Sequence, residues 1–556
     1  MPSPSPVPSA VPTRSATPAA TPSPSPVPSP SGTIAFNDWS TYQYDAARDG
    51  FNPNTTAITP ASIANLHVAW QVAVGEGADF QPLIATNVAG HTALVIVAGY
   101  QTIHAYDAQT GAVVWKDELL GQNIQDCGTS GITGTAAYDA ALGAIFVAAG
   151  NGSTMSPSHV LLYELYAATG AVMTSVDVTP NLVTGEATSG HTAVTLANGM
   201  LYLGTGSNCE GTTTGLPSWL GRIVAVNPNT MAIANTFYTT YGQGGNTYGG
   251  GGVWAWGGVS ADANGNVYAG SGNAETADTI KQTPPPPVVI APNENSGYAE
   301  QLVKLTSNLS TVEDSNAPTF NFSFGQIDLD YPGTPTLFQP PINSGCSDLL
   351  SATMGKGGLL VVNDTTNLNP PVNQYQLSIP TGNAYYIGNP GYSPNLGYLY
   401  GAINSSGRGG AMLPPGLAAI GNCGSSIVWN AQFGPDSSAF GHGDNPRSAP
   451  TVTSGGVVFI GTACTANSSG GCGTPTSTVN GALWAVDASA GTVLNGGNPL
   501  LTTADDIRMA PSADAKWLWV TDKSGNLYGM TVDPTVPAVA KRRGTYHAQH
   551  YHFISD

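Results

Sequence analysis

Short apolar runs bounded by turn residues recur along the whole chain. Clear examples cover residues 144–149, 200–204 and 457–461. Continuous or alternating apolar runs of this length are typical of β-strands. The chain also has 69 glycines and 43 prolines, and only 9% of its residues are charged, which favours many short strands joined by tight turns. The pattern therefore predicts an all-β protein with little helix.

A repeated motif, aliphatic-x-Ala-x-Asp-Ala-x-Thr-Gly, follows these strands and is clearest at residues 103–111. Its copies lie about 60 residues apart. The other copies cover residues 165–170, 225–228, 303–306, 361–364, 418–421, 484–488 and 527–530. A four-stranded sheet cannot cover both of its faces, so repeated sheets must stack, and radial closure removes their open edges. The repeat predicts an eight-bladed β-propeller of four-stranded antiparallel blades.

Each repeat has a structural explanation. The Asp and Gly of the motif are expected to shape a hairpin turn, and Trp115 or its equivalent to dock against the neighbouring blade. The strand at residues 67–72, around Trp70, has no blade of its own, so we expect it to complete the last blade as a closing strap. The proline-rich stretch 283–295 is predicted to interrupt the fourth blade as a surface loop.

The two ends of the chain differ in composition from its middle. Residues 1–34 consist almost wholly of Pro, Ser, Ala, Thr and Val, a composition that predicts a disordered tether. The propeller is expected to cover residues 35–540, followed by a basic, histidine-containing tail at 541–556. His547, His550 and His552 in that tail are either metal ligands or part of an exposed end.

Charge and hydropathy exclude two classes of partner. The net charge is −19, with 15 Lys and Arg against 34 Asp and Glu, and the few basic residues are mostly scattered. The few basic residues could neutralise little of the charge of a phosphate backbone, which argues against nucleic acid as a partner. No run of 18 apolar residues occurs, so no transmembrane segment is predicted.

The six cysteines form no Cys-x-x-Cys or Cys-x-x-Cys-His motif, which argues against zinc and haem. An even number favours up to three disulfides. The best single pairing is Cys464 with Cys472, while the other four allow three pairings. Disulfides indicate an extracellular or periplasmic location, and residues 1–34 are candidates for a tether to the cell surface.

The stretch 39–48, with Asn52 and Pro53, resembles the opening motif of the pyrroloquinoline quinone (PQQ) alcohol dehydrogenases and their secreted PQQ-like relatives. The similarity extends to about residue 540 and implies the same eight-bladed propeller. It also implies PQQ near the axis beside calcium or a lanthanide, an aspartate as general base, and oxidation of an alcohol. Without a haem motif, the electrons would pass to an external acceptor.

The resemblance assigns roles around residues 252–273. Trp254 or Trp256 matches the tryptophan on which the quinone stacks, and Asn273 matches a ligand of the metal. An indole offers a broad floor to a planar cofactor, and an amide oxygen suits a hard cation. The alternative is that both tryptophans simply fill a blade interface.

Further on, the segment 327–331 resembles the one that bears the catalytic aspartate. Asp328 is then the general base and, with Asp330, a metal ligand, because carboxylates two apart on a strand point the same way. Lys356 falls where the family places a cation against the quinone oxygens. The alternatives are a turn-forming pair of aspartates and a solvated lysine.

The chain departs from the family at two points. Cys127 stands where many active members have two adjacent cysteines against the quinone, and residues 150–159 contain no glutamate for the metal. These departures leave two alternatives. One is a cofactor-free extracellular scaffold that binds a protein, glycan or surface. The other is a lyase or hydrolase that uses His191 or His442.

Overall fold

The structure is a computed structural model of the whole chain. It describes residues 34–75, 77–119, 131–151, 159–182, 188–190, 192–207, 219–243, 249–272, 274, 297–318, 333–355, 358–377, 388–403, 413, 416–433, 444–464 and 481–539. The described residues from Ala35 onward belong to one unit. The predicted tether, the proline-rich loop and the C-terminal histidines fall outside the described residues, so these predictions remain untested.

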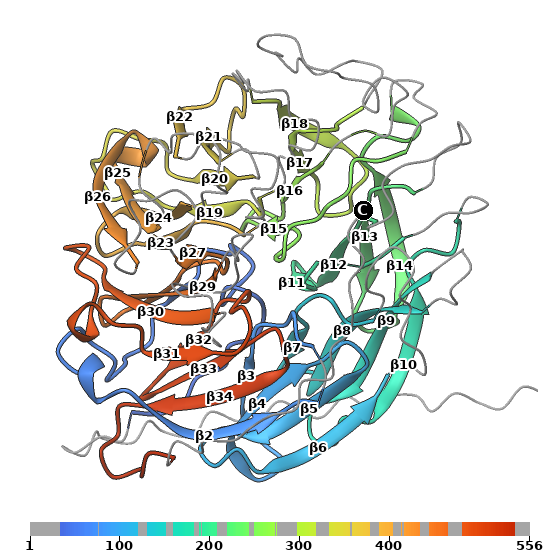
Figure 1. Cartoon of the computed structure of the whole chain (residues 1–556). Helices are drawn as coiled ribbons and strands as arrows, with labels where there is room; N and C mark the ends of the chain where they lie inside the picture. Colours follow the sequence, from blue (N-terminus) through green and yellow to red (C-terminus); the bar gives the residue numbers. More distant parts are fainter. Residues whose placement is uncertain are drawn as a thin grey trace, which may run out of the picture. The chain divides into compact units, whose positions relative to one another are not determined.

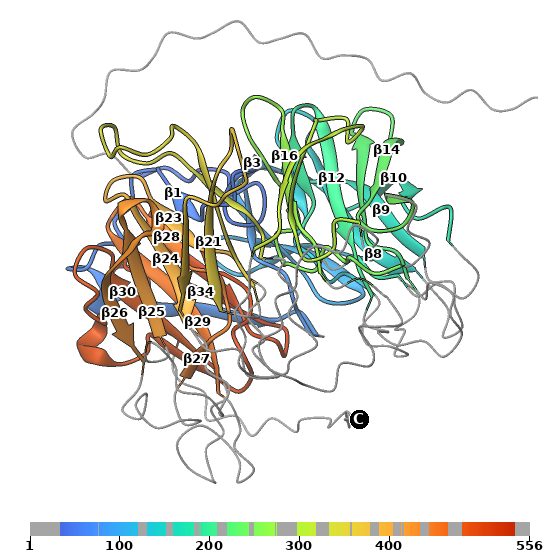
Figure 2. The same cartoon turned by 90° about the horizontal axis from the view of Figure 1, so that it is seen from above.

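Eight β-sheets stand around a central axis as the blades of a propeller (Figures 1 and 2). Blade 1 is made of β3 (Leu83–Val88), β4 (His91–Ala98), β5 (Thr102–Asp107) and β6 (Val113–Glu118). In each blade neighbouring strands pair antiparallel, and the first strand is innermost. The prediction of eight four-stranded antiparallel blades is confirmed.

The strands of blades 2 to 5 follow in chain order. They are β7 (Ala137–Asp139), β8 (Ala144–Asn151), β9 (His159–Tyr166) and β10 (Val172–Asp177) in blade 2; β11 (Thr195–Ala197), β12 (Met200–Thr205), β13 (Arg222–Asn227) and β14 (Ala232–Tyr238) in blade 3; β15 (Ser260–Ala261), β16 (Val267–Gly270), β17 (Leu302–Leu305) and β18 (Val312–Asn316) in blade 4; and β19 (Thr336–Phe338), β20 (Leu350–Met354), β21 (Leu359–Asp364) and β22 (Asn373–Gln376) in blade 5.

The remaining blades include strands from elsewhere in the chain. They are β23 (Gly391–Ser393), β24 (Tyr398–Ile403), β25 (Gly416–Gly421) and β26 (Ser426–Gln432) in blade 6; β28 (Thr451–Thr453), β29 (Val457–Cys464), β30 (Gly481–Asp487) and β31 (Leu501–Thr503) in blade 7, joined by β1 (Phe51–Asn52) and β27 (Asp444–Pro446); and β32 (Ser512–Asp514), β33 (Trp517–Thr521), β34 (Asn526–Thr531) and β2 (His67–Ala73) in blade 8. The described helices are the short 3₁₀ turns η1 (Ile63–Asn65), η5 (Asn422–Gly424) and η6 (Asn495–Gly497). Among all the residues that the structure describes, no helix is long and apolar enough to span a bilayer.

Strand β2 closes the ring. It pairs antiparallel with β34, with Trp70 opposite Gly529, so the outermost strand of the last blade comes from before the first blade. The strap predicted around Trp70 is confirmed. This closure ties the two ends of the described chain together (Figure 1).

Tryptophans on the outermost strands join successive blades. Trp115 of blade 1 lies over Gly170 in the β9–β10 turn of blade 2, and its Nε1 donates to Ala167 O at 2.9 Å. Trp70 of blade 8 lies in the same way over Gly111 of blade 1, and Trp429 of blade 6 over Gly491 of blade 7. A β-carbon on Gly170 would lie 2.4 Å from the indole, so glycine is the residue that makes room for the ring.

At other contacts between neighbouring blades, which we call seams, polar residues take the place of the indole. Asn235 of blade 3 donates to Asn308 O in blade 4, at 2.9 Å. Asp314 of blade 4 accepts a hydrogen bond from Leu368 N in blade 5. Side-chain hydrogen bonds therefore hold these seams where the next turn offers no glycine face to an indole.

The seam between blades 5 and 6 also carries a disulfide. Asn373 of blade 5 donates to Cys423 O in the turn of blade 6, and Cys423 is bonded to Cys346 of blade 5. This pairing is one of the three that the sequence leaves open for the other four cysteines. Cys472 lies outside the described residues, so the predicted pairing of Cys464 with Cys472 stays a prediction.

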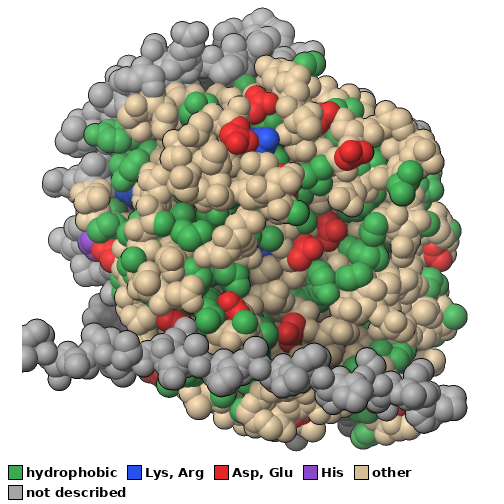
Figure 3. Space-filling model, turned by 180° about the vertical axis from the view of Figure 1, so that it is seen from behind, with side chains coloured by type: hydrophobic (Ala, Val, Ile, Leu, Met, Phe, Trp, Pro, Cys, Tyr) green, Lys and Arg blue, Asp and Glu red, His purple; other side chains and the backbone are tan. Residues whose placement is uncertain are grey.

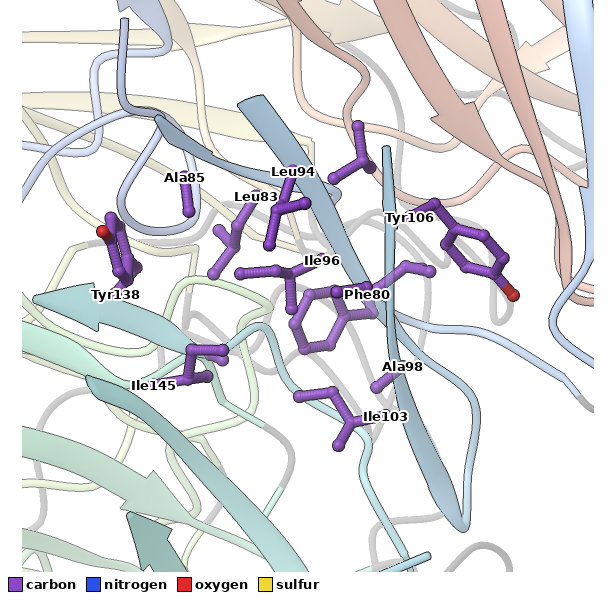
Figure 4. Packing of buried hydrophobic residues seen from close by; sticks show 14 of the residues in the cluster. Phe80, Leu83, Ala85, Leu94, Ile96, Ala98, Ile103, Tyr106, Tyr138 and Ile145 are labelled. Atoms are coloured by element: carbon purple, nitrogen blue, oxygen red, sulfur yellow. The ribbon is translucent and has the colours of Figure 1, made fainter. Parts of the chain in front are cut away.

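Buried aliphatic and aromatic side chains fill the space between blades. Figure 4 shows the core around blade 1, where Phe80 and Ile103 lie close to Ile145 of blade 2. All three are fully buried. On the outside, basic side chains are sparse on the face seen in Figure 3, which agrees with the strongly negative net charge.

A segment at residues 39–52, which we name the belt, contacts the innermost strand of every blade in chain order. Its first and last contacts are Trp39 with Ile84 of blade 1 and Asn52 with Ala513 of blade 8. The hydrogen-bonded partners are Ile84, Tyr138, Val194, Ala261, Leu337, Tyr392, Val452 and Ala513. The motif that resembles the family's opening stretch therefore runs around the axis and contacts each of the eight blades in turn.

Hydroxyl groups form a second set of contacts around the axis. Thr451 of blade 7 donates to Pro511 O of blade 8, at 2.6 Å, and Thr336 of blade 5 donates in the same way to Pro390 O of blade 6. The other donors of this set are Thr195, Ser260 and Ser512. Serine or threonine at the start of an innermost strand thus satisfies a buried carbonyl of the next blade.

We predict that Gly170→Ala destabilises the propeller much more than Gly143→Ala. Both glycines have a positive φ, +75° and +61°, so both substitutions carry the same backbone cost. Only Gly170 faces an indole, whereas nothing lies within 4 Å of a β-carbon at Gly143. Urea unfolding should show a loss of about 3 kcal/mol for Gly170→Ala and about 1 kcal/mol for Gly143→Ala. Equal losses would contradict the docking of Trp115.

A second prediction concerns His104, a buried residue of β5. Its Nδ1 accepts a hydrogen bond from Tyr106 Oη and its Nε2 donates to Thr102 Oγ1, both at 2.9 Å, if the neutral ring carries its proton on Nε2. Burial, with a smaller effect of Lys116, lowers the pKa of His104 to about 4. The unfolded chain therefore takes up this proton first as the pH falls. The stability that His104 contributes is full above pH ~6.5 and is lost between pH ~6.5 and ~4, by at most about 3 kcal/mol.

The measurement is the free energy of unfolding against pH for the protein and for His104→Phe. The variant should show a flatter profile between pH ~6.5 and ~4, because it has no proton to take up at this position. Parallel profiles would mean that another group causes the acid sensitivity.

Candidate functional site

One end of the axis gathers the connections on which all the predicted site residues fall. In an antiparallel four-stranded blade, the innermost strand begins at the same end where the outermost strand stops and where the second strand turns into the third. Trp254 and Trp256 lie between β14 and β15, and Cys127 lies between β6 and β7. The other connections involved are β16–β17 with Asn273, β18–β19 with Asp328 and Asp330, and β20–β21 with Lys356. We name this end of the axis the loop end.

The structure describes two of these residues, Trp254 and Trp256. Cys127, Asn273, Asp328, Asp330 and Lys356 lie outside the described residues, as do His191 and His442. Their predicted roles remain untested. Among the residues that are described, no group of three His, Cys, Asp or Glu side chains could hold a metal ion.

Trp254 is a packed interface residue. Only 9% of it is exposed, its ring lies against Gly206, and its centroid is 5.5 Å from that of Trp219 in an edge-on arrangement. Both neighbours belong to the connections and strands of blade 3. Trp254 therefore fills the space between blades 3 and 4, which is the structural alternative that the sequence left open.

Trp256 instead lies at the axis. It is half-buried and packs against a cluster drawn from across the propeller. The cluster comprises Tyr42 of the belt, Ala193 of blade 3, Ala449 of blade 7, and Met509 and Ala510 of blade 8. Residues of opposite blades meet only near the axis, so the indole of Trp256 forms part of the floor of the loop end.

Tyr42 of the belt packs at the axis with the cluster that Trp256 contacts. It is fully buried, and a β-carbon on Gly257 would lie 2.8 Å from its ring. Burial raises the pKa of Tyr42 well above its usual range, so the phenol stays neutral. We use the name cup for the described residues around the axis at the loop end, including Trp256 and the cluster on which it packs.

Charged residues of blades 7, 8 and 1 stand on the described side of this cup. The Tyr100 hydroxyl donates to Asp79 Oδ2 at 3.3 Å, and Asp79 is buried with its Oδ1 free of hydrogen bonds. Arg508 Nε donates to Asp506 Oδ2 at 3.4 Å. Arg447, on the connection into blade 7, lies near enough to Asp506 to affect its pKa.

Burial and neighbouring charges shift the pKa values of this group. Burial raises the pKa of the Tyr100 hydroxyl, and the Asp79 carboxylate raises it further, so Tyr100 keeps its proton. Burial lowers the pKa of Arg508, but the carboxylates of Asp79 and Asp506 outweigh it and the net shift is upward. Arg508 therefore remains a cation at the edge of the cup.

Asp79, Tyr100, Arg447 and Arg508 were not predicted from the sequence. A local signal was nevertheless present for three of them. Asp79, Arg447 and Arg508 each stand three residues before a proline, at Pro82, Pro450 and Pro511, and each of these prolines directly precedes an innermost strand. A charged residue at this spacing lies where the chain enters a blade at the loop end. Tyr100 had no such signal.

Comparisons with known proteins confirm the resemblance seen in the sequence. Residues 39–194 match the family model for PQQ proteins described as glucose/ethanol/alcohol dehydrogenase, beta-propeller domain. No curated protein matches the chain. The match covers the belt and the first two blades.

Solved structures of quinoprotein dehydrogenases share the fold. The quinohemoprotein alcohol dehydrogenase of Comamonas testosteroni matches 92% of this chain over 82% of its own, with a TM-score of 0.64 and 16% identity. A europium-containing methanol dehydrogenase matches 89% of this chain over 98% of its own, with a TM-score of 0.64 and 14% identity. A quinohemoprotein alcohol dehydrogenase of Pseudomonas putida HK5 is similar at a TM-score of 0.62, 15% identity and coverage of 91% and 82%. The chain thus has the eight-bladed fold of these enzymes.

Proposed function

We propose that this propeller of the quinoprotein alcohol dehydrogenase type binds PQQ in the cup at the loop end and oxidises an alcohol there. The observation that carries the proposal is the half-buried indole of Trp256, which packs at the axis on a cluster that includes Tyr42 of the belt. The electrons would leave to an external acceptor. The substrate class is a small-molecule alcohol.

The described residues fit the shape and charge of such a cofactor. PQQ is planar and carries carboxylates, and an indole face offers a broad apolar surface on which a planar ring stacks. Arg508 and Arg447 place two guanidinium groups, which can pair with carboxylates, at this end of the axis beside Asp506. The fit therefore rests on the indole face and on these two guanidinium groups.

Sequence-assigned residues complete the proposed site. Lys356 and Cys127 would contact the cofactor, and Asn273, Asp328 and Asp330 would hold a calcium ion, whose preferred ligands are oxygens. When bound, PQQ would supply the acceptor for two electrons. Asp328 takes the proton of the substrate hydroxyl as general base.

Two described residues, Asp79 and Tyr100, are placed to contact a ligand at the edge of this site. The Tyr100 hydroxyl donates a hydrogen bond to Asp79 Oδ2, which fixes the carboxylate and leaves Oδ1 as an acceptor for a hydroxyl or water of the ligand. The Tyr100 ring is itself held, because a β-carbon on Gly77 would lie 2.5 Å from it. Asp79 and Tyr100 would therefore orient a ligand, and burial together with the Asp79 carboxylate raises the pKa of the Tyr100 hydroxyl so that it keeps its proton.

The proposal places the protein outside the cytoplasm. The disulfide between Cys346 and Cys423 supports this location, because such bonds persist in oxidising compartments. Residues 1–34 would tether the propeller to the cell surface.

The test of cofactor binding is a titration of the full chain with PQQ and calcium, followed by the absorbance of the quinone. We expect saturable binding that Trp256→Leu weakens at least about tenfold, because the stacking face is lost. Trp429→Leu is the matched control, since Trp429 lies on the outer seam and should leave binding unchanged. Absence of binding at tens of micromolar PQQ would overturn the proposal and favour the cofactor-free scaffold.

A second test addresses the general base. Asp328→Asn should abolish reduction of an artificial dye with simple alcohols, while the affinity for PQQ and the thermal unfolding temperature stay close to those of the unsubstituted protein. An amide keeps the size of the side chain but accepts no proton at neutral pH. Unaltered turnover would remove Asp328 from the mechanism.

A further inference from the structure

Arg48 is a fully buried cation of the belt whose hydrogen bonds go to neutral oxygens. Its Nη1 donates to Thr41 Oγ1 at 2.8 Å and to Tyr42 O, and its Nε donates to Val259 O at 3.3 Å. Its Nη2 donates to Thr195 Oγ1. These contacts tie the belt to blades 3 and 4.

No carboxylate within the described residues forms an ion pair with this guanidinium. Asp45 is close enough to act on its pKa, but the Asp45 carboxylate accepts from Ala47 N instead. A buried charge without a partner costs several kcal/mol of stability. Neutral donors could hold the same carbonyl and hydroxyl oxygens, so holding the belt does not by itself explain the charge.

The charge lies beside the cluster on which Trp256 packs. The Arg48 guanidinium carbon is 5.9 Å from the centre of the Tyr42 ring. Tyr42 belongs to the cluster against which Trp256 packs, and its ring touches Gly257. Tyr42 therefore connects the Arg48 guanidinium with the surroundings of the Trp256 indole.

We propose that Arg48 is a positioning residue whose positive field, acting through Tyr42, makes the exposed face of Trp256 selective for planar anions. The inference rests on the proposed function and deepens it, since it assigns an electrostatic role beneath the cofactor. A charge held in a low-dielectric interior is felt further than one in water and is weakly screened by salt. Burial lowers the pKa of Arg48 only to about 10, so it stays charged at neutral pH.

The first experiment compares PQQ binding by the full-length protein, Arg48→Gln and Arg48→Lys, with folding checked by circular dichroism. Arg48→Gln should weaken binding about tenfold, and the loss should persist at high salt, because the charge is buried. Arg48→Lys keeps the charge and should retain most of the affinity. Equal affinities of the Gln and Lys variants, in a protein that binds PQQ, would overturn the inference and leave the proposed function intact.

The second experiment needs no cofactor. Quenching of Trp256 is obtained as the difference in fluorescence between the protein and Trp256→Phe, with iodide, caesium and acrylamide as quenchers. We expect Arg48→Gln to reduce quenching by iodide about twofold or more and to raise quenching by caesium, with acrylamide unchanged. If Arg48 had only a structural role, its substitution would change quenching by acrylamide in the same direction as quenching by both ions. That result would overturn the inference even if PQQ does not bind.

Should Arg48→Gln not fold, the same ratio is measured for Arg48→Met, which removes the charge and keeps a long side chain. The iodide-to-caesium ratio of Trp256 quenching should be lower in this variant than in Arg48→Lys. Equal ratios in the two variants would overturn the inference.

Discussion

The docking of each outermost strand onto the turn of the next blade is the contact on which the ring depends. A propeller closes only if every blade meets its neighbour at the same angle, and the indole of Trp115 over Gly170 shows how this is achieved. Glycine there adopts a positive φ and offers a flat backbone face to the ring. At two other contacts between blades, Asn235 donates to Asn308 O and Asp314 accepts from Leu368 N instead. The residue on the outermost strand and the residue in the turn of the next blade therefore constrain each other.

The belt joins the eight blades at the axis. Residues 39–52 form hydrogen bonds with residues of all eight blades, and Tyr42 packs in the cluster that Trp256 contacts. The belt contacts also run in chain order, so one short segment fixes the relative positions of elements hundreds of residues apart. The arrangement of the residues at the loop end therefore depends on the belt.

The sequence predicted the features that arise from local patterns. Eight blades, the turns and the strap at Trp70 follow from apolar alternation and from the spacing of aspartate and glycine, and the structure confirms them. It did not predict the contacts between distant segments, such as Asp79 beside Arg508 or Cys346 bonded to Cys423, because nothing local marks which residues meet. For the site, the sequence proposed two tryptophans as stacking residues, and the structure shows that Trp254 is buried whereas Trp256 is half-buried, which leaves their roles as predictions. Cys127, Asn273, Asp328, Asp330 and Lys356 remain predictions.

Strain and buried charge coincide in the belt. Gln43, Tyr44 and Arg48 all have a positive φ, which is uncommon for residues with side chains, and Arg48 is buried without an ion pair among the described residues. Each feature opposes folding, by about 1–3 kcal/mol for a strained residue and by several for the charge. The eight-fold contacts of the belt over-determine its path and so can hold both. A segment needed only to fill the axis could use neutral side chains there. The proposed electrostatic effect on Trp256, which packs on the same cluster as Tyr42, would give the retained cation a role beyond holding the belt.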